Sequence, residues 1–149
     1  MKTKNRMIQS VFFISLIFLS LTTFGQQQKD PWSALQLMEP ENLAQVMNDP
    51  KAHQPVILCV GPAATIKNSI EIGPAKELAN VANLTHYLKN IAKDEIVVLY
   101  CGCCPFDRCP NVRPAFEALN KMGFKNHRLL NLAHNLKVDW IDHGYPVNE

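Results

Sequence analysis

An unbroken apolar run that leads directly into four closely spaced cysteines is the feature that most constrains the fold of this sequence. Residues 96–100, IVVLY, contain β-branched and aromatic side chains and no charged one. Such a run is typical of a strand that is covered on both faces in a parallel sheet. The cysteine-rich loop, residues 101–109, is therefore expected at the carboxyl end of a buried strand.

An amphipathic helix is expected directly after this loop. Val112, Phe116 and Leu119 recur at helical spacing and form one apolar face. Asn111 is expected to cap the helix, because its side-chain oxygen can accept a hydrogen bond from a free amide of the first turn. Gly123 is expected to end the helix. The amides and the positive dipole end of this helix would then face the loop, which favours an anion or a thiolate there.

The rest of the chain alternates expected strands and helices. The expected elements are an edge strand at Pro31–Leu37, a helix at Pro40–Met47, a strand at Val56–Val60, a helix at Leu78–Ile91, a strand near Arg128–Asn131 and an amphipathic piece at Leu136–Trp140, with residues 63–75 ambiguous. This alternation predicts an α/β domain with a parallel central sheet and helices on both faces. His127 and His143 are expected at the surface, whereas His134 could approach the loop.

The first 25 residues have the pattern of a secretory signal peptide. Basic residues precede an apolar run, Val11–Leu21, that is shorter than the roughly 18 residues that a spanning helix needs. Thr23 and Gly25 place small side chains at the −3 and −1 positions of a cleavage site. We expect residues 1–25 to be removed and the protein to be exported, periplasmic or secreted. An uncleaved N-terminal anchor is the alternative.

The expected mature chain has a polar tether at residues 26–32 and a single domain at residues 33–149. The sequence has 15 Lys and Arg and 13 Asp and Glu; three of the basic residues and none of the acidic ones lie in the leader, which leaves 12 against 13. This nearly neutral balance gives no reason to expect binding to nucleic acid, or to a membrane after cleavage. The composition predicts no oligomeric state.

The cysteines predict sulfur chemistry. Export allows disulfides without excluding free thiols. Cys101 is the first residue past the strand, where the helix dipole and free amides would lower the pKa of the thiol and stabilise a thiolate nucleophile. Its sulfur must be ionised and reachable from solvent for this role. Cys59 stands alone in an apolar strand and is expected to be a small buried hydrophobic residue.

These segments resemble the rhodanese-like family. The resemblance rests on IVVLYC, VRPAFEALNKMGFKNHRLLNL and the closing NLKVDWIDHGYPV, and on MEPENLAQVMND and PVILCVG nearer the N-terminus; it covers about residues 33–147. It implies a single rhodanese-like α/β domain. It also implies a sulfurtransferase whose strand-end cysteine takes up a sulfane sulfur as a persulfide and passes it to a thiol or to cyanide. By position that nucleophile is Cys101.

The resemblance implies that the loop binds an anionic sulfur donor. Arg108 and Arg113 are the candidate anion-binding side chains, because guanidinium groups suit oxyanions. The other candidate loop residues are Gly102, Cys104, Pro105, Phe106, Asp107 and Cys109. The loop is longer than in that family, so Cys103 is an alternative nucleophile or a resolving thiol. A small sulfur-containing anion or a thiol acceptor is the expected partner, and no cofactor is expected.

The cysteine spacing leaves two other functions open. A dithiol–disulfide redox or sensing module needs a thiolate near a second thiol, and Cys104 with Cys109 is the candidate disulfide that leaves Cys101 reactive. A soft-metal module would bind Cu(I) or zinc through thiolates. Its candidate ligands are Cys101, Cys103, Cys104 and Cys109, although the pattern lacks the paired Cys-x2-Cys spacing of ordinary zinc sites.

Overall fold

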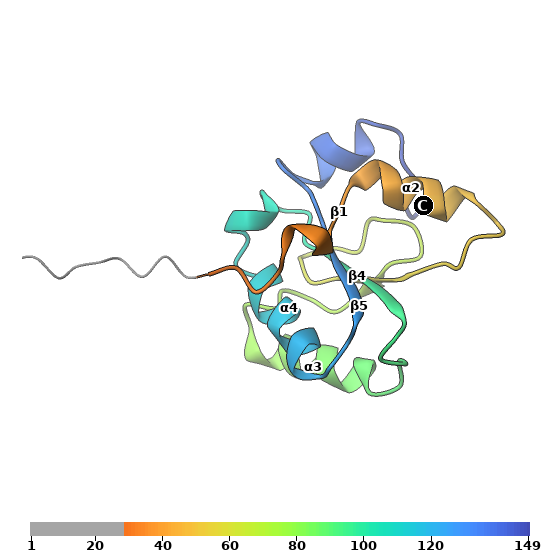
Figure 1. The fold of residues 1–149 in the computed structure, drawn as a ribbon. Coiled ribbons are helices and arrows are strands. Elements are labelled where there is room, and N and C mark those ends of the chain that lie inside the picture. The colour runs from red at the N-terminus through yellow and green to blue at the C-terminus, as the bar shows by residue number, and fades with distance from the viewer. Residues whose placement is uncertain (1–28) are drawn as a thin grey trace, which may run out of the picture.

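A computed structural model describes residues 29–149 of the chain. In this range the chain forms one domain, in which a parallel sheet carries helices on both faces (Figure 1). The predicted α/β class is confirmed. The predicted signal peptide, residues 1–25, and the start of the predicted tether lie outside the described residues. Between residues 29 and 149, no helix has the length and apolar character needed to cross a membrane.

The helices and strands follow the predicted alternation. The strands are β1 (Leu37–Met38), β2 (Val56–Cys59), β3 (Ile70–Glu71), β4 (Ile96–Tyr100) and β5 (Asn126–Leu130). The helices are α2 (Pro40–Asn48), α3 (Leu78–Leu88) and α4 (Val112–Lys121), with short helical turns η1 (Ala34–Gln36), η2 (Phe106–Arg108) and η3 (Lys137–Ile141). The sheet order is β1-β5-β4-β2-β3, and every neighbouring pair is parallel.

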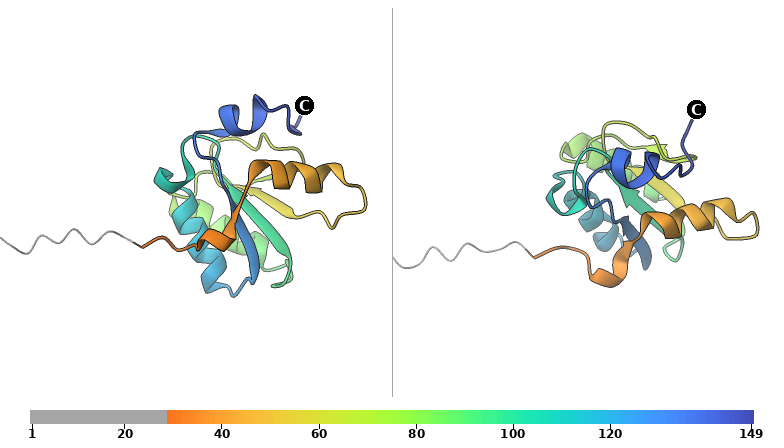
Figure 2. Two further views of the ribbon diagram at one scale, coloured as in Figure 1. Left: turned by 45° about the horizontal axis from the view of Figure 1, so that its top comes forward. Right: turned by 90° about the horizontal axis from the view of Figure 1, so that it is seen from above.

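Strand β4 is the centre of the sheet and is buried on both faces. Val97 and Leu99 belong to the core on the side of α3 and α4, together with Leu84 and Phe116. Val98 and Tyr100 belong to the core on the opposite side, together with residues of α2 and η3. Figure 2 shows these two layers on either side of the strands. A strand without charged side chains is what such two-sided burial requires.

The prediction of an edge strand at Pro31–Leu37 is wrong in its position. The edge strand is the two-residue β1, and a short helical turn precedes it. Trp32 is not in a strand, and its ring lies 5.7 Å from the Phe116 ring and 6.0 Å from the Phe106 ring. The N-terminal segment is therefore held by aromatic packing against α4 and the loop, and not by a sheet hydrogen-bond ladder.

The expected surface position of His127 is also wrong. This residue lies on β5 and is 2 % exposed. Its ring packs 4.5 Å from the Phe116 ring, and its Nε2 atom lies 2.8 Å from Asn120 Oδ1. Burial lowers the pKa of His127, because the charged imidazolium would lose its hydration. His143 is exposed, as expected.

Candidate functional site

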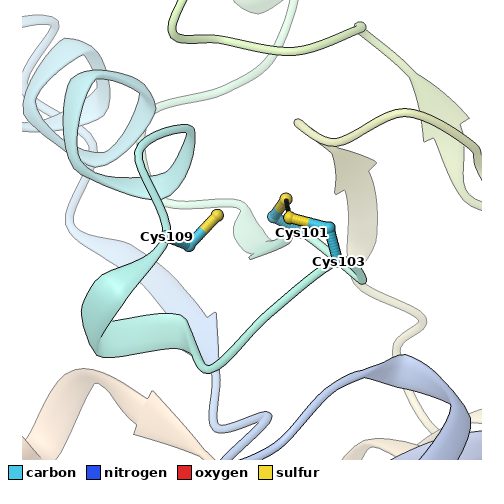
Figure 3. A group of neighbouring side chains, drawn as sticks. All are labelled: Cys101, Cys103 and Cys109. Atoms are coloured by element: carbon cyan, nitrogen blue, oxygen red, sulfur yellow. Dashed lines mark hydrogen bonds between the residues drawn. The ribbon is translucent and has the colours of Figure 1, made fainter.

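The candidate site lies where β4 ends and the chain turns toward α4. Cys101 is the first residue after β4, Cys103 follows two residues later, and Cys109 comes directly after η2. Their three Sγ atoms all lie within 4.8 Å of one another. Cys109 faces the other two side chains across the loop (Figure 3). We call these three residues the cysteine cluster; it brings together predicted site residues from both ends of the loop.

Two glycines allow the backbone to approach the cluster closely. A Cβ atom on Gly61, the residue after β2 and Val60, would lie 2.8 Å from Cys101 Sγ. A Cβ atom on Gly102 would lie 2.8 Å from Leu136 Cβ, and the Leu136 amide donates a hydrogen bond of 3.0 Å to the Gly102 carbonyl. Both distances are shorter than a real Cβ contact. Gly102 was a predicted loop residue, whereas the role of Gly61 was not predicted, because it depends on β2 lying beside β4.

The environment of Cys101 stabilises its thiolate. The pKa of Cys101 falls to about 5, chiefly through a hydrogen bond with the Cys109 thiol, against the opposing effect of burial. The backbone amide of Cys103 and the side chains of Asn111 and Cys103 lower the pKa further. Asn111 Nδ2 and Cys103 Sγ each lie 3.3 Å from Cys101 Sγ, and Cys109 Sγ lies within 4.8 Å. An ionised Cys101 was predicted, but side chains supply much of the stabilisation that was assigned to the helix.

Asn111 has a different role from the predicted one. It does not cap α4, since its own backbone is helical and its side chain makes no hydrogen bond to the first turn. Its Oδ1 atom accepts a hydrogen bond of 3.0 Å from the Lys76 amide, and its Nδ2 atom donates to Cys101 Sγ. The residue is 5 % exposed. A buried amide satisfied at both ends holds the Cys101 sulfur in place.

The prediction that the Cys101 sulfur is reachable from solvent is wrong for this conformation. Cys101 is 2 % exposed and Cys109 is 4 % exposed. Cys103 is exposed, and Cys104 is half-buried. The sulfur atoms form a short series from the interior to the surface, with 3.3 Å from Cys101 to Cys103 and 3.0 Å from Cys103 to Cys104. The exposed Cys103 sulfur is therefore a direct neighbour of the buried Cys101 sulfur.

None of the four loop cysteines is bridged, and the three members of the cluster differ in protonation. All five cysteines of the chain lie in the described range, and all are free thiols. The predicted Cys104–Cys109 bridge is thus not formed, and the nearest sulfur to Cys104 is that of Cys103. Partial desolvation, together with hydrogen bonds to Cys104 and Cys101, raises the pKa of Cys103 to about 12, and the hydrogen bond with Cys101 raises the pKa of Cys109. Cys101 is therefore the ionised member of the cluster.

The two candidate arginines lie in different settings. The Arg113 guanidinium donates a hydrogen bond of 2.6 Å to Asp30 and one of 3.2 Å to the Lys29 carbonyl, and it lies 5.2 Å from the Trp32 ring. It is engaged with the N-terminal segment, which argues against the predicted anion-binding role. Arg108 is exposed on η2, and none of the ion pairs found between residues 29 and 149 involves it.

The remaining loop residues are structural or exposed. Phe106 packs on Trp32, and its amide donates a hydrogen bond of 3.0 Å to the Leu132 carbonyl. Pro105 is the residue directly before η2. Asp107 is exposed, next to Arg108 in the sequence. His134 does not join the cluster: its exposed ring bonds to Asp139 at 2.9 Å. These contacts fix the shape of the loop.

Cys59 is a buried residue outside the cluster. It is 0 % exposed at the end of β2, and its thiol donates to the Ala63 carbonyl at 3.1 Å. Burial raises the pKa of Cys59, so the thiol stays protonated. The expectation of a small buried hydrophobic residue is confirmed.

Comparison with known proteins finds matches among solved structures and none among protein families or curated sequences. Solved structures of EanB are similar: wild-type EanB has a TM-score of 0.54 and 19 % identity, over 83 % of this chain and 29 % of that one. A cysteine-to-serine variant of EanB in complex with hercynine has a TM-score of 0.52 and 20 % identity, over 76 % of this chain and 27 % of that one.

The present chain therefore spans less than a third of the length of these EanB chains. At this level of identity the likeness shows a shared fold. The parallel sheet with its covering helices is common to this chain and to part of EanB.

Proposed function

We propose that this domain is a rhodanese-like sulfurtransferase that takes up a sulfane sulfur on Cys101. The observation that carries the proposal is the placement of the Cys101 sulfur at the end of the central strand, 3.3 Å from the buried Asn111 amide. The thiolate is the form of cysteine that attacks sulfur. Hydrogen-bond donors around Cys101 stabilise its thiolate and so keep it from being protonated. The same donors suit the persulfide anion that the reaction forms.

The reaction proceeds in two displacements. The Cys101 thiolate attacks the outer sulfur of the donor, a new S–S bond forms, and the donor's own bond to that sulfur breaks with its electron pair leaving on the departing group. For thiosulfate the departing group is sulfite. An acceptor thiolate or cyanide then attacks the outer sulfur of the persulfide and releases the Cys101 thiolate. No net oxidation occurs, because the sulfane sulfur carries its oxidation state from donor to acceptor.

Access to Cys101 in this proposal depends on Cys103. The Cys103 side chain is exposed and has a single rotatable bond to its sulfur, so that turning it away from Cys101 uncovers the buried thiolate. Arg108, exposed on η2 near the loop, is the cation available to attract an anionic donor. Arg113 is less suited to that task while it is paired with Asp30.

A dithiol–disulfide module is the second candidate, and the short sulfur separations favour it. Cys103 lies 3.3 Å from Cys101 and 3.0 Å from Cys104. In an exchange with a small disulfide, the Cys101 thiolate attacks one sulfur and the other leaves as a thiolate. Cys103 then loses its proton and displaces the remaining half of the small disulfide, which leaves a Cys101–Cys103 disulfide and two reduced small thiols. This reaction yields no persulfide.

Intact-mass measurement of the reduced, metal-free protein before and after thiosulfate separates the two functions. We expect a gain of one sulfur atom, which is lost in Cys101→Ser and retained in Cys59→Ala, a matched control because Cys59 is buried outside the cluster. No sulfur uptake by the wild-type protein contradicts the transferase. A loss of the mass of two hydrogen atoms on exposure to a small disulfide, without sulfur uptake, supports the redox module instead.

Alkylation of Cys101 tests the access step. In Cys103→Ala the rate of Cys101 modification by a neutral alkylating agent should rise, because a side chain 3.3 Å from the Cys101 sulfur is removed. Peptide mapping identifies the modified cysteine, and Cys59→Ala provides the reference rate. An unchanged or slower rate in Cys103→Ala shows that access is controlled elsewhere.

A further inference from the structure

The cysteine cluster has a second property that sulfur transfer does not require. Transfer needs one thiolate, whereas three sulfur atoms converge here within 4.8 Å of one another. They come from the two ends of one loop: Cys101 and Cys103 follow β4, and Cys109 follows η2 (Figure 3). The loop is folded back by the Phe106 amide, which bonds to the Leu132 carbonyl, so the convergence is part of the fold.

Two of the three cysteines lie in the hydrophobic core, where the Asn111 amide is a polar neighbour of Cys101. Cys101 and Cys109 belong to the hydrophobic core together with Val60 and Val112. The group of neighbouring ligand atoms contains cysteine sulfurs and neither a carboxylate nor an imidazole. A cluster of sulfur donors without oxygen ligands favours soft ions over magnesium or calcium.

The spacing fits three ligands around one ion. With metal–sulfur bonds of about 2.3 Å, three sulfurs in a plane around an ion lie about 4 Å from one another. The observed separations run from 3.3 Å, between Cys101 and Cys103, to a limit of 4.8 Å. A small movement of the exposed Cys103 side chain would lengthen the shortest separation toward 4 Å. Structural zinc takes four ligands, and the fourth cysteine, Cys104, lies outside this group of three.

We propose that Cys101, Cys103 and Cys109 form a three-thiolate site for a soft monovalent ion, Cu(I). Each ligand binds as a thiolate, so metal entry displaces the protons that remain on the cluster, and the oxidation state of the metal does not change. The exposed side of the site, at Cys103, gives the ion a route from solvent. Because Cys101 is a ligand, Cu(I) also blocks sulfur uptake at this residue.

Anaerobic titration of the purified, reduced protein with Cu(I), against a chromophoric Cu(I) chelator, tests the site. We expect one ion per chain. Cys101→Ser, Cys103→Ser and Cys109→Ser should each lower the affinity by about tenfold or more, since even changes outside the ligand set cost 10- to 100-fold. Cys59→Ala is the matched control and should keep the wild-type affinity within about threefold, because Cys59 lies outside the cluster. Cys104→Ser changes a residue whose Sγ atom lies 3.0 Å from Cys103 Sγ, and it should lower the affinity less than any of the three ligand variants. X-ray absorption of the loaded protein should show sulfur neighbours only, three in number.

Other results overturn the proposal. Equal loss of affinity in Cys104→Ser would make the site four-coordinate, and tighter retention of Zn²⁺ than of Cu(I) would assign it to zinc. If the protein does not compete with the chelator for Cu(I), the three cysteines do not form a Cu(I) site. Sulfur uptake is measured on metal-free protein, so this proposal and the transferase proposal can fail separately.

Discussion

One sulfur atom in this domain is held as an anion by groups that are distant in sequence. Cys101 receives the Asn111 amide from ten residues downstream, and Asn111 is itself fixed by the Lys76 amide. Cys109 and Cys103 keep their protons and share them with Cys101 as hydrogen-bond donors. The stabilisation is therefore spread over neutral donors, which allows a negative sulfur to stay buried without a salt bridge.

The titration of Cys101 is predicted to lie far below that of an ordinary thiol. Ultraviolet absorbance of the thiolate, followed in metal-free protein, should show one inflection near pH 5. Asn111→Ala should raise the pKa of Cys101 by about one to two, because a hydrogen bond to a charged group contributes about 1.5–3 kcal/mol. Cys101→Ser should lack the inflection. An inflection that persists in Cys101→Ser would assign the thiolate to another cysteine.

The same ionisation links stability to pH. Because the pKa of Cys101 is lower in the folded protein than the ordinary 9.0, the unfolded chain binds this proton more tightly. The contribution to stability is fully present above pH 9.0 and is lost as the pH falls to about 5. Denaturant unfolding should therefore show a steeper rise in the free energy of unfolding over this range for the wild-type protein than for Cys101→Ser. Parallel curves would contradict the linkage.

At the scale of the element, the loop between β4 and α4 keeps its shape by close backbone packing. The Gly102 carbonyl accepts from the Leu136 amide, next to η3, and the Phe106 amide donates to the Leu132 carbonyl after β5. The loop is thus tied to the segment that follows β5. Adjacent parallel strands place these two segments at the same edge of the sheet.

Replacing Gly102 tests this packing. Gly102→Ala would place a Cβ atom 2.8 Å from Leu136 Cβ, and we expect the free energy of unfolding to fall by about 1–3 kcal/mol. Leu136→Ala removes the close contact with Leu136 Cδ2 at 3.0 Å and keeps the one with Leu136 Cβ, so it relieves part of the clash. The double variant should therefore lose less stability than the sum of the two single variants. Additive losses in denaturant unfolding would show that the two residues do not compete for space.

At the scale of the whole molecule, the local sequence pattern predicted the helices and strands but not the contacts between them. The apolar run at Ile96–Tyr100 and the helical spacing after Asn111 depend on neighbours in sequence, and both elements formed as predicted. Asn111 was misassigned because its side chain turns to Lys76, which no local pattern reveals. The close packing around Cys101 likewise involves Gly61, which follows β2 and Val60, and Cys103. The cysteines were found from spacing, but their separate roles required the fold.

The N-terminal segment should stabilise the whole domain through Trp32. Its ring packs between Phe106 of the loop and Phe116 of α4, and the Arg113 guanidinium lies over it. Trp32→Ala should lower the free energy of unfolding by about 1–3 kcal/mol, since a partly buried aromatic contact is lost. Leu35→Ala is the control, because Leu35 is 89 % exposed and should change stability by less than about 0.5 kcal/mol. Equal denaturation midpoints for the two variants would show that residues before β1 do not support the loop.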